Sequence, residues 1–174
     1  MRAKAGMTIA IAALICLFLN SVLFDKLNFW DIRPDMVIAL AVALGITVGS
    51  MHAGLVCGGI GLLWDILFYK MIGINAAIYL LSGIICGRFF RKYYANNALI
   101  PALIGLGLSF IKDNIFAVIV ALGNVSYSYP LMLVSYILPS ALFTGIMCIP
   151  LFYCLKPILA RYSKSLSEKR DDYA

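Results

Sequence analysis

The chain has 174 residues, of which 63% are hydrophobic and only 13% are charged, and its mean hydropathy is +0.97. A soluble domain is typically about 45–50% apolar and about 25% charged, so the composition excludes an ordinary globular domain and a disordered chain. The five cysteines are scattered through apolar runs, which excludes a disulfide-stapled secreted module. An integral membrane protein remains, with room for about six or seven crossings of about 20 residues each.

Six continuous apolar stretches follow one another, and they predict an all-α integral membrane protein built as a compact bundle of about six transmembrane helices. The stretches are roughly Met7–Phe24, Pro34–Val48, His52–Tyr69, Ile72–Phe90, Ala98–Leu122 and Pro130–Leu155. A transmembrane barrel would instead alternate apolar and polar residues. The second stretch is short, so it is either a full crossing or one arm of a re-entrant hairpin with the third. We predict a transmembrane domain over residues 1–162 and a polar cytoplasmic tail over residues 163–174.

The uneven distribution of Lys and Arg predicts the orientation of the bundle. With six crossings, ten of these residues fall on the side of the two termini and three on the other side, while Lys112 lies inside a span. Cytoplasmic loops carry the excess of positive charge in membrane proteins. We therefore predict that both termini are cytoplasmic.

Small residues recur at helical spacing within the spans, and we expect them to pack helices against one another, because small side chains let helices approach closely in lipid. The members of these stripes are Gly45, Gly49, Gly54, Gly58, Gly61, Gly83 and Gly87. Packing within one bundle is the first interpretation. Docking of a partner's helix on one stripe is the alternative.

Ionisable side chains inside the predicted spans are the main candidates for a functional site, because such residues are rare in membranes. Counted from the cytoplasmic face at about 1.5 Å per residue, Asp65 and Lys112 lie at similar depth in the outer half. We therefore predict that they pair. The full set of partner-docking or pocket candidates is Asn20, Asp35, Trp64, Asp65, Asn75, Lys112 and Asp113. The alternative is a satisfied polar cluster that only fixes the register of the helices.

Signals of catalysis or cofactor binding are weak. The single histidine, His52, lies beside a predicted turn, and the cysteines include no Cys-x-x-Cys pair, so a metal site is not expected. No strand precedes a Gly-rich phosphate loop. The basic, aromatic segment Arg88–Tyr94 lies beside a span and predicts an anchor to anionic lipid, not contact with nucleic acid. We predict no enzyme, no cofactor and no nucleic-acid partner.

Four motifs follow one another between residues 33 and 88. Arg33-Pro34-Asp35 opens the second span, a Gly-rich segment ending at Asp65 fills the third, Gly73-Ile74-Asn75-Ala76 opens the fourth, and Gly87 is near its end. In this order and spacing the chain resembles the bacterial rod shape-determining protein MreD family. That family has Pro-Asp at the second span, Gly-x-x-x-Asp spacing in the third and Gly-Leu/Ile-x-Ala opening the fourth. The matching positions are Pro34, Asp35, Gly61, Asp65, Gly73, Ile74, Asn75, Ala76 and Gly87. Spans five and six contain no such motif.

The resemblance implies a non-enzymatic membrane scaffold of the cell-elongation (rod) complex in the bacterial cell membrane, which maintains cell shape by organising peptidoglycan synthesis. Besides membrane lipid, the implied partners are an MreC-like protein, the actin-like MreB, a SEDS glycosyltransferase and a class B penicillin-binding protein. The implied fold resembles the substrate-binding subunits of energy-coupling-factor transporters. That likeness supports a rival interpretation, a vitamin-binding membrane subunit of such a transporter.

Overall fold

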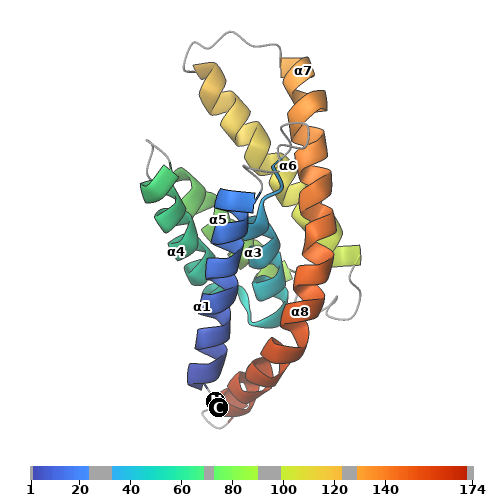
Figure 1. The fold of residues 1–174 in the computed structure, drawn as a ribbon. Helices are drawn as coiled ribbons and strands as arrows, with labels where there is room; N and C mark the ends of the chain where they lie inside the picture. Colours follow the sequence, from blue (N-terminus) through green and yellow to red (C-terminus); the bar gives the residue numbers. More distant parts are fainter. Residues whose placement is uncertain (1, 24–32, 69–72, 90–98, 123–128, 172–174) are drawn as a thin grey trace.

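A computed structural model describes residues 2–23, 33–68, 73–89, 99–122 and 129–171, and all regular secondary structure within these ranges is helical (Figure 1). The elements are α1 (Arg2–Phe18), the π-helical turn η1 (Leu19–Leu23), α3 (Met36–Thr47), α4 (Ser50–Phe68), α5 (Ile74–Phe89), α6 (Leu99–Leu122), α7 (Tyr129–Met132), the π-helical turn η2 (Leu133–Ile137) and α8 (Leu138–Asp171). Because α1 continues into η1, and α7 and η2 continue into α8, the described elements form six helical rods. The predicted all-α fold with six helical segments is therefore confirmed over these ranges.

Three of the described helical segments are long and apolar enough to cross a membrane, namely Met51–Phe68, Leu99–Leu122 and Tyr129–Pro157. Three shorter apolar helices accompany them, over Ile9–Ser21, Met36–Thr47 and Ile74–Arg88. The expectation of six spans is thus met in part, with six helical segments of which three have the length of a full crossing. Four of the Lys and Arg residues that predict the orientation, Lys26, Lys70, Arg91 and Lys92, lie outside the described residues.

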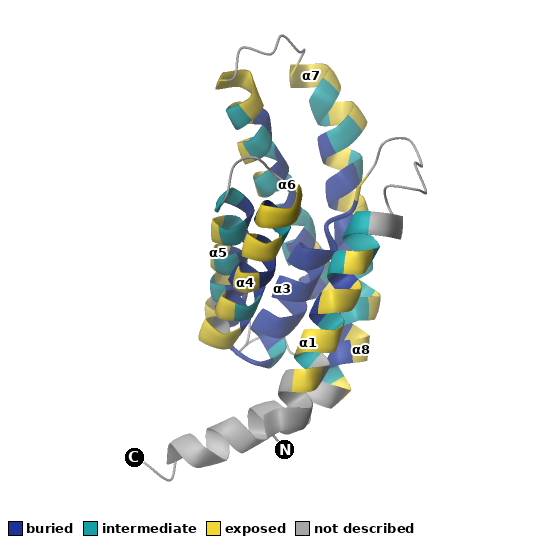
Figure 2. Ribbon diagram, turned by 60° about the vertical axis from the view of Figure 1, so that its left-hand side comes forward, coloured by how far each residue is buried: buried dark blue, intermediate teal, exposed yellow. Residues whose placement is uncertain are grey.

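Helix α3 forms the centre of the bundle and is buried on every side, from Met36 to Ile46 (Figure 2). Its sequence explains this position, because a helix that is apolar all round is typical of a buried site. Helices α1, α4, α5, α6 and α8 all contact it. Its 12 residues rise about 18 Å in total, which is less than the roughly 30 Å thickness of a bilayer's hydrocarbon core.

A tight turn reverses the chain directly after α3. The backbone N–H groups of Val48 and Gly49 donate to the carbonyl oxygen of Leu44 at 2.8 and 3.4 Å, and α4 begins at Ser50. Gly49 has a φ of +120°, a backbone conformation that favours glycine. Gly49 therefore forms the turn, and its role in packing one helix on another stays a prediction. Because α3 is short and α4 has the length of a full crossing, both alternatives for the second and third apolar stretches stay predictions.

The α4–α5 contact is built from glycines. A Cβ atom placed on Gly83 of α5 would lie 2.8 Å from the backbone nitrogen of Gly54, and one on Gly61 would lie 2.7 Å from the Cα of Ala76. Gly58 faces the side chain of Leu80 at 3.0 Å. At Gly83 and Gly61, backbone atoms lie less than 3.0 Å from the added Cβ, so rotating a side chain cannot make room for a larger residue. At Gly58, the side chain of Leu80 would have to move. These glycines therefore allow the two helices to pack closely within one chain.

Small residues also form the contact between α3 and α5. A Cβ atom on Gly45 would lie 3.0 Å from the backbone nitrogen of Gly87 and 3.1 Å from the carbonyl oxygen of Gly83. Helix α5 therefore presents small residues to α3 as well as to α4. Together these contacts hold α3, α4 and α5 as one tightly packed unit.

Helices α6 and α8 form the other side of the bundle. The buried residues of α6 recur every fourth position, at Pro101, Gly105, Ser109, Asp113 and Ala117. On the α8 side of this contact, η2 ends two residues before Pro139, which has no N–H to donate to the preceding turn. Pro150 and Pro157 lie within α8, and the helix curves along its length (Figure 1). A proline inside a helix removes a backbone hydrogen bond and bends the helix, which accounts for this curvature.

Candidate functional site

The candidate site is built around the N-terminus of α3, in the interior of the bundle. Asp35 is the N-cap of this helix, and its Oδ1 accepts hydrogen bonds from the backbone nitrogens of Val37 at 2.9 Å and Ile38 at 3.1 Å. Pro34 precedes it and disfavours helical conformation at Arg33, so the sequence itself starts the helix at Met36. The cap places a buried carboxylate at the positive end of the helix dipole.

The second carboxylate oxygen of Asp35 is paired with a positively charged side chain. Its Oδ2 forms an ion pair with the ammonium group of Lys112 from α6 and accepts a hydrogen bond of 2.7 Å from the hydroxyl group of Tyr79 on α5. The Lys112 nitrogen also lies 3.4 Å from the Tyr79 hydroxyl and 5.4 Å from the centre of the Tyr79 ring. The side chains of Lys112 and Asp35 are 15% and 5% exposed. Both charges are thus compensated inside the protein.

Polar side chains from two further elements satisfy the backbone at this point. The backbone nitrogen of Asp35 donates to the hydroxyl oxygen of Thr144 on α8 at 2.9 Å, and that of Met36 donates to Asn20 Oδ1 on η1 at 3.1 Å. Ser109 on α6 donates to the Thr144 hydroxyl at 3.3 Å. Five elements, η1, α3, α5, α6 and α8, therefore meet at one polar centre, which we call the Asp35 centre.

Asp65 serves a different and more local purpose. Its Oδ2 accepts hydrogen bonds from the backbone nitrogens of Gly73 at 2.8 Å and Ala76 at 3.3 Å, and its Oδ1 accepts one of 2.7 Å from the Asn75 side chain. The fully buried carboxylate thus binds the first turn of α5 and closes the α4–α5 hairpin. An anion is favourable at a helix N-terminus, where the N–H groups lack helical acceptors.

The predicted Asp65–Lys112 pair is wrong. Lys112 bonds Asp35, whereas Asp65 bonds the start of the helix that follows it. The prediction used only depth along the helix axis, which does not define the neighbour of each side chain. The α4–α5 hairpin returns the chain to Asp65 within eight residues, so its oxygens are occupied by local donors.

The remaining candidates lie at the edges of this centre. Trp64 is half-buried and stacks on Phe68, with ring centres 4.4 Å apart. Asp113 is buried beside α8, and its Oδ2 has no hydrogen-bond partner among the described residues. Sequence reasoning missed Tyr79 and Thr144. Their signal was present, because Tyr79 follows Asn75 by four residues and Thr144 follows Ser140 by four, which places each pair on one face of a helix.

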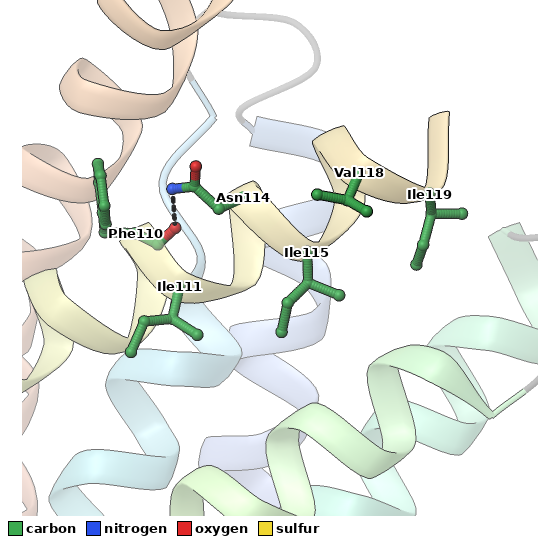
Figure 3. Close-up of a pocket in the computed structure, with 6 residues that line it drawn as sticks. All are labelled: Phe110, Ile111, Asn114, Ile115, Val118 and Ile119. Atoms are coloured by element: carbon green, nitrogen blue, oxygen red, sulfur yellow. Dashed lines mark hydrogen bonds between the residues drawn. The ribbon is translucent and has the colours of Figure 1, made fainter. Parts of the chain in front are cut away.

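On its outer face, α6 carries a shallow apolar groove of about 380 Å³ (Figure 3). Its lining residues are Phe110, Ile111, Asn114, Ile115, Val118 and Ile119. The amide nitrogen of Asn114, the polar member, donates to the carbonyl oxygen of Phe110 at 2.7 Å. The groove therefore suits a hydrocarbon chain, while the adjacent Lys112 turns inward. Within the described ranges, no group of three or more His, Cys, Asp or Glu residues could hold a metal ion.

The apolar helices and the internally paired charges define a helical membrane protein whose polar groups hold the bundle together. The chain belongs to the rod shape-determining protein MreD family, whose sequence model matches residues 1–158. No curated protein and no solved structure matches the chain. Members of this family are membrane proteins of the rod-shape complex that act in the determination of cell shape and are not known as enzymes. The resemblance seen over residues 33–88 thus extends over nine-tenths of the chain.

Proposed function

We propose that this protein is a non-enzymatic scaffold of the rod complex, which maintains cell shape by organising peptidoglycan synthesis at the cell membrane. The observation that carries the proposal is the internal pairing of its intramembrane charges. Asp35 and Lys112 bond each other, and Asp65 bonds the start of α5. Groups bound in this way stiffen a bundle and leave its outer faces to make contacts. Membership of the MreD family supports the same role.

The proposed partners are an MreC-like protein, the actin-like MreB, a SEDS glycosyltransferase and a class B penicillin-binding protein. Helix α4 offers an apolar outer face to such partners or to lipid. Its large exposed residues include Leu55, Leu62, Leu63 and Ile66. Gly59 lies on the same face, with no atom within 4 Å of a Cβ placed on it. The groove on α6 would hold an acyl chain of membrane lipid.

Both termini are proposed to lie in the cytoplasm. The start of α1 and the end of α8 lie at the same end of the bundle (Figures 1 and 2), and the Lys and Arg distribution assigns that end to the cytoplasm. In intact cells, a cysteine introduced by Asp172→Cys should resist an impermeant thiol reagent. The matched Tyr129→Cys variant, at the opposite end, should react. Labelling of the first and protection of the second would invert the orientation.

The functional proposal is tested by depletion in a rod-shaped host. Depleted cells should become round and swell while they still produce the glycosyltransferase and the transpeptidase. A wild-type copy and a Gly107→Ala copy should restore rods, because a Cβ at Gly107 meets open space. Lys112→Ala should restore them less, because the Asp35 centre is broken. Normal rods combined with a vitamin requirement would reject the scaffold in favour of the transporter subunit. The fold likeness to transporter subunits remains a prediction.

A further inference from the structure

Helix α8 continues well beyond the apolar part of its sequence. The sixth apolar stretch ends at Leu155, Lys156 is the first charged residue after it, and the helix runs on to Asp171. Residues 158–171 therefore add a rise of about 21 Å to the helix. Leu155 is still buried in the bundle, whereas Pro157 is exposed. The added segment thus begins where the chain leaves the hydrocarbon core and reaches the level of the lipid headgroups.

Two opposite stripes run along this part of the helix, because residues three and four apart share one face. One stripe is apolar, with the members Leu155, Ile158, Leu159, Tyr162 and Leu166. The other joins a proline to four charged residues, with the members Pro157, Arg161, Lys164, Glu168 and Asp171. The two stripes are offset by two residues, which is about 200° around an α-helix. The end of α8 is therefore an amphipathic helix.

The position of Pro157 sets the direction in which this helix bends. The ring of a proline clashes with the carbonyl group of the residue four positions earlier, so the helix opens on the side of the proline and bends toward the other side. Pro157 lies on the charged stripe, and the other side is the apolar stripe. In Figure 1 the last turns of α8 run oblique to the rest of the helix. A helix that leaves the membrane and bends in this direction turns its apolar stripe back to the bilayer surface.

The charges at the end of α8 complement an anionic surface. Lys169 and Arg170 follow Leu166 by three and four residues, which places them beside the apolar stripe. Glu168 and Asp171 belong to the opposite stripe. Basic side chains beside an apolar face can extend to lipid phosphates while their stems stay on apolar surface. The acidic residues are then on the side away from the phosphates.

We propose that residues 158–171 form a membrane-surface helix that binds anionic phospholipid. The apolar stripe lies in the headgroup region, and Lys169 and Arg170 bind phosphate groups beside it. Helices with an apolar face and basic residues bind membranes in this way, and their affinity depends on anionic lipid. The inference is independent of the role of the protein in cell shape, because it rests on the pattern and bend of α8 alone.

The accessibility of nitroxide labels on the full chain tests the proposal. One label is attached through Leu166→Cys on the apolar stripe and a matched one through Glu168→Cys on the opposite stripe, both in a Cys154→Ser background that removes the exposed native thiol. In vesicles that contain phosphatidylglycerol, the label at position 166 should be more accessible to oxygen, which concentrates in the bilayer, than to a water-soluble nickel chelate. The label at position 168 should show the reverse.

Charge variants test which lipid the helix recognises. The double variant Lys169→Gln, Arg170→Gln should lower the equilibrium constant for surface contact of the label at position 166 by about fivefold for each charge removed. The matched Lys164→Gln variant, on the opposite stripe, should change it less than twofold. All of these positions lie beyond Leu155, the last residue of the apolar stretch, so the bundle should fold as in the wild type. An equal effect of Lys164→Gln would contradict binding through the flanks of the apolar stripe.

Three further results would overturn the proposal. One is equal access of the nickel chelate to both labels in phosphatidylglycerol vesicles, which would leave the apolar stripe in water, where a protein partner could bind it. Another is the same protection at position 166 in vesicles of phosphatidylcholine alone, which would show that anionic lipid is not recognised. The third is a label at position 166 that neither oxygen nor the chelate reaches, in vesicles and in detergent, which would place the stripe against the protein itself. None of these results changes the outcome expected from depletion in cells.

Discussion

The α4–α5 hairpin and the Asp35 centre use the same chemistry over very different distances in sequence. In both, a buried carboxylate accepts hydrogen bonds at a helix N-terminus. The donors to Asp65 lie 8, 10 and 11 residues away, whereas Asp35 draws on partners 44 and 77 residues away and donates its own N–H across 109 residues. Damage at Asp65 should therefore stay within one hairpin, while damage at Asp35 should affect the whole bundle.

The largest effect is expected from Lys112→Ala. Breaking a buried ion pair by removing one partner costs about 3–5 kcal/mol, because the other charge is left uncompensated. The free energy of unfolding in bicelles should fall by about that amount, and the protein level in membranes should fall with it. The double variant Asp35→Asn, Lys112→Met should recover part of the loss. A single variant as stable as wild type would show that the pair is not what joins α3 to α6.

The next effect concerns the glycines that hold the hairpin. Gly83→Ala places a Cβ atom against the backbone of Gly54, so the α4–α5 unit should lose about 1–3 kcal/mol. Gly59→Ala is the matched control on the same pair of helices. Because its Cβ meets open space, it should change nothing or gain up to about 1 kcal/mol of helix stability. Equal unfolding free energies for the two variants would contradict the close approach.

Asp65→Ala should act locally. It leaves the partly buried N–H groups of Gly73 and Ala76 without their acceptor, which costs up to about 3 kcal/mol. Asp65→Asn should be milder, since it keeps an acceptor oxygen. Hydrogen exchange should rise at the first turn of α5 and remain unchanged in α6. Combined with Lys112→Ala, the two losses should add within about 0.5 kcal/mol. A larger coupling free energy between the two substitutions would instead support a direct interaction of Asp65 with Lys112.

The smallest effect is expected from Tyr79→Phe, which removes one hydroxyl group from the Asp35 centre. Hydrogen bonds within membranes contribute about 0.6 kcal/mol on average and up to about 1.7 kcal/mol. The ion pair remains, so the loss should fall within that range in a bicelle unfolding experiment. A loss as large as that of Lys112→Ala would mean that the hydroxyl, not the ammonium group, compensates Asp35.

The sequence allowed the helices to be predicted but not the partners of the charges. Hydropathy predicted the six segments, and the short second stretch already suggested that α3 is shorter than a full crossing. Pro34-Asp35 before an apolar run is also a recognised start of a helix. Depth, however, describes only the position along a helix axis. The packing of α3 against α6 determines that Lys112 meets Asp35 and not another carboxylate.

Tyr79, Ser140 and Thr144 were overlooked for a related reason. A hydroxyl group in an apolar span is common, and by itself it predicts nothing. Their roles depend on the folded start of α3. The backbone N–H of Asp35 needs Thr144 as an acceptor, Asp35 Oδ2 receives the Tyr79 hydroxyl, and the Arg33 carbonyl oxygen receives the Ser140 hydroxyl. Gly49 shows the opposite limitation, because its spacing fits a packing stripe although its φ of +120° places it in a turn.

The unequal heights of the helices have a consequence for the surrounding bilayer. Helix α6 has 24 residues and a rise of about 36 Å, whereas α5 has 16 residues and a rise of about 24 Å. Around the perimeter, the hydrophobic thickness that the protein presents to lipid therefore changes by about a third. A bilayer thins, or the flanking residues snorkel, beside a hydrophobic helix shorter than its hydrocarbon core. Such hydrophobic mismatch would make the α5 side favourable for partners with short spans and the α6 side favourable for long ones.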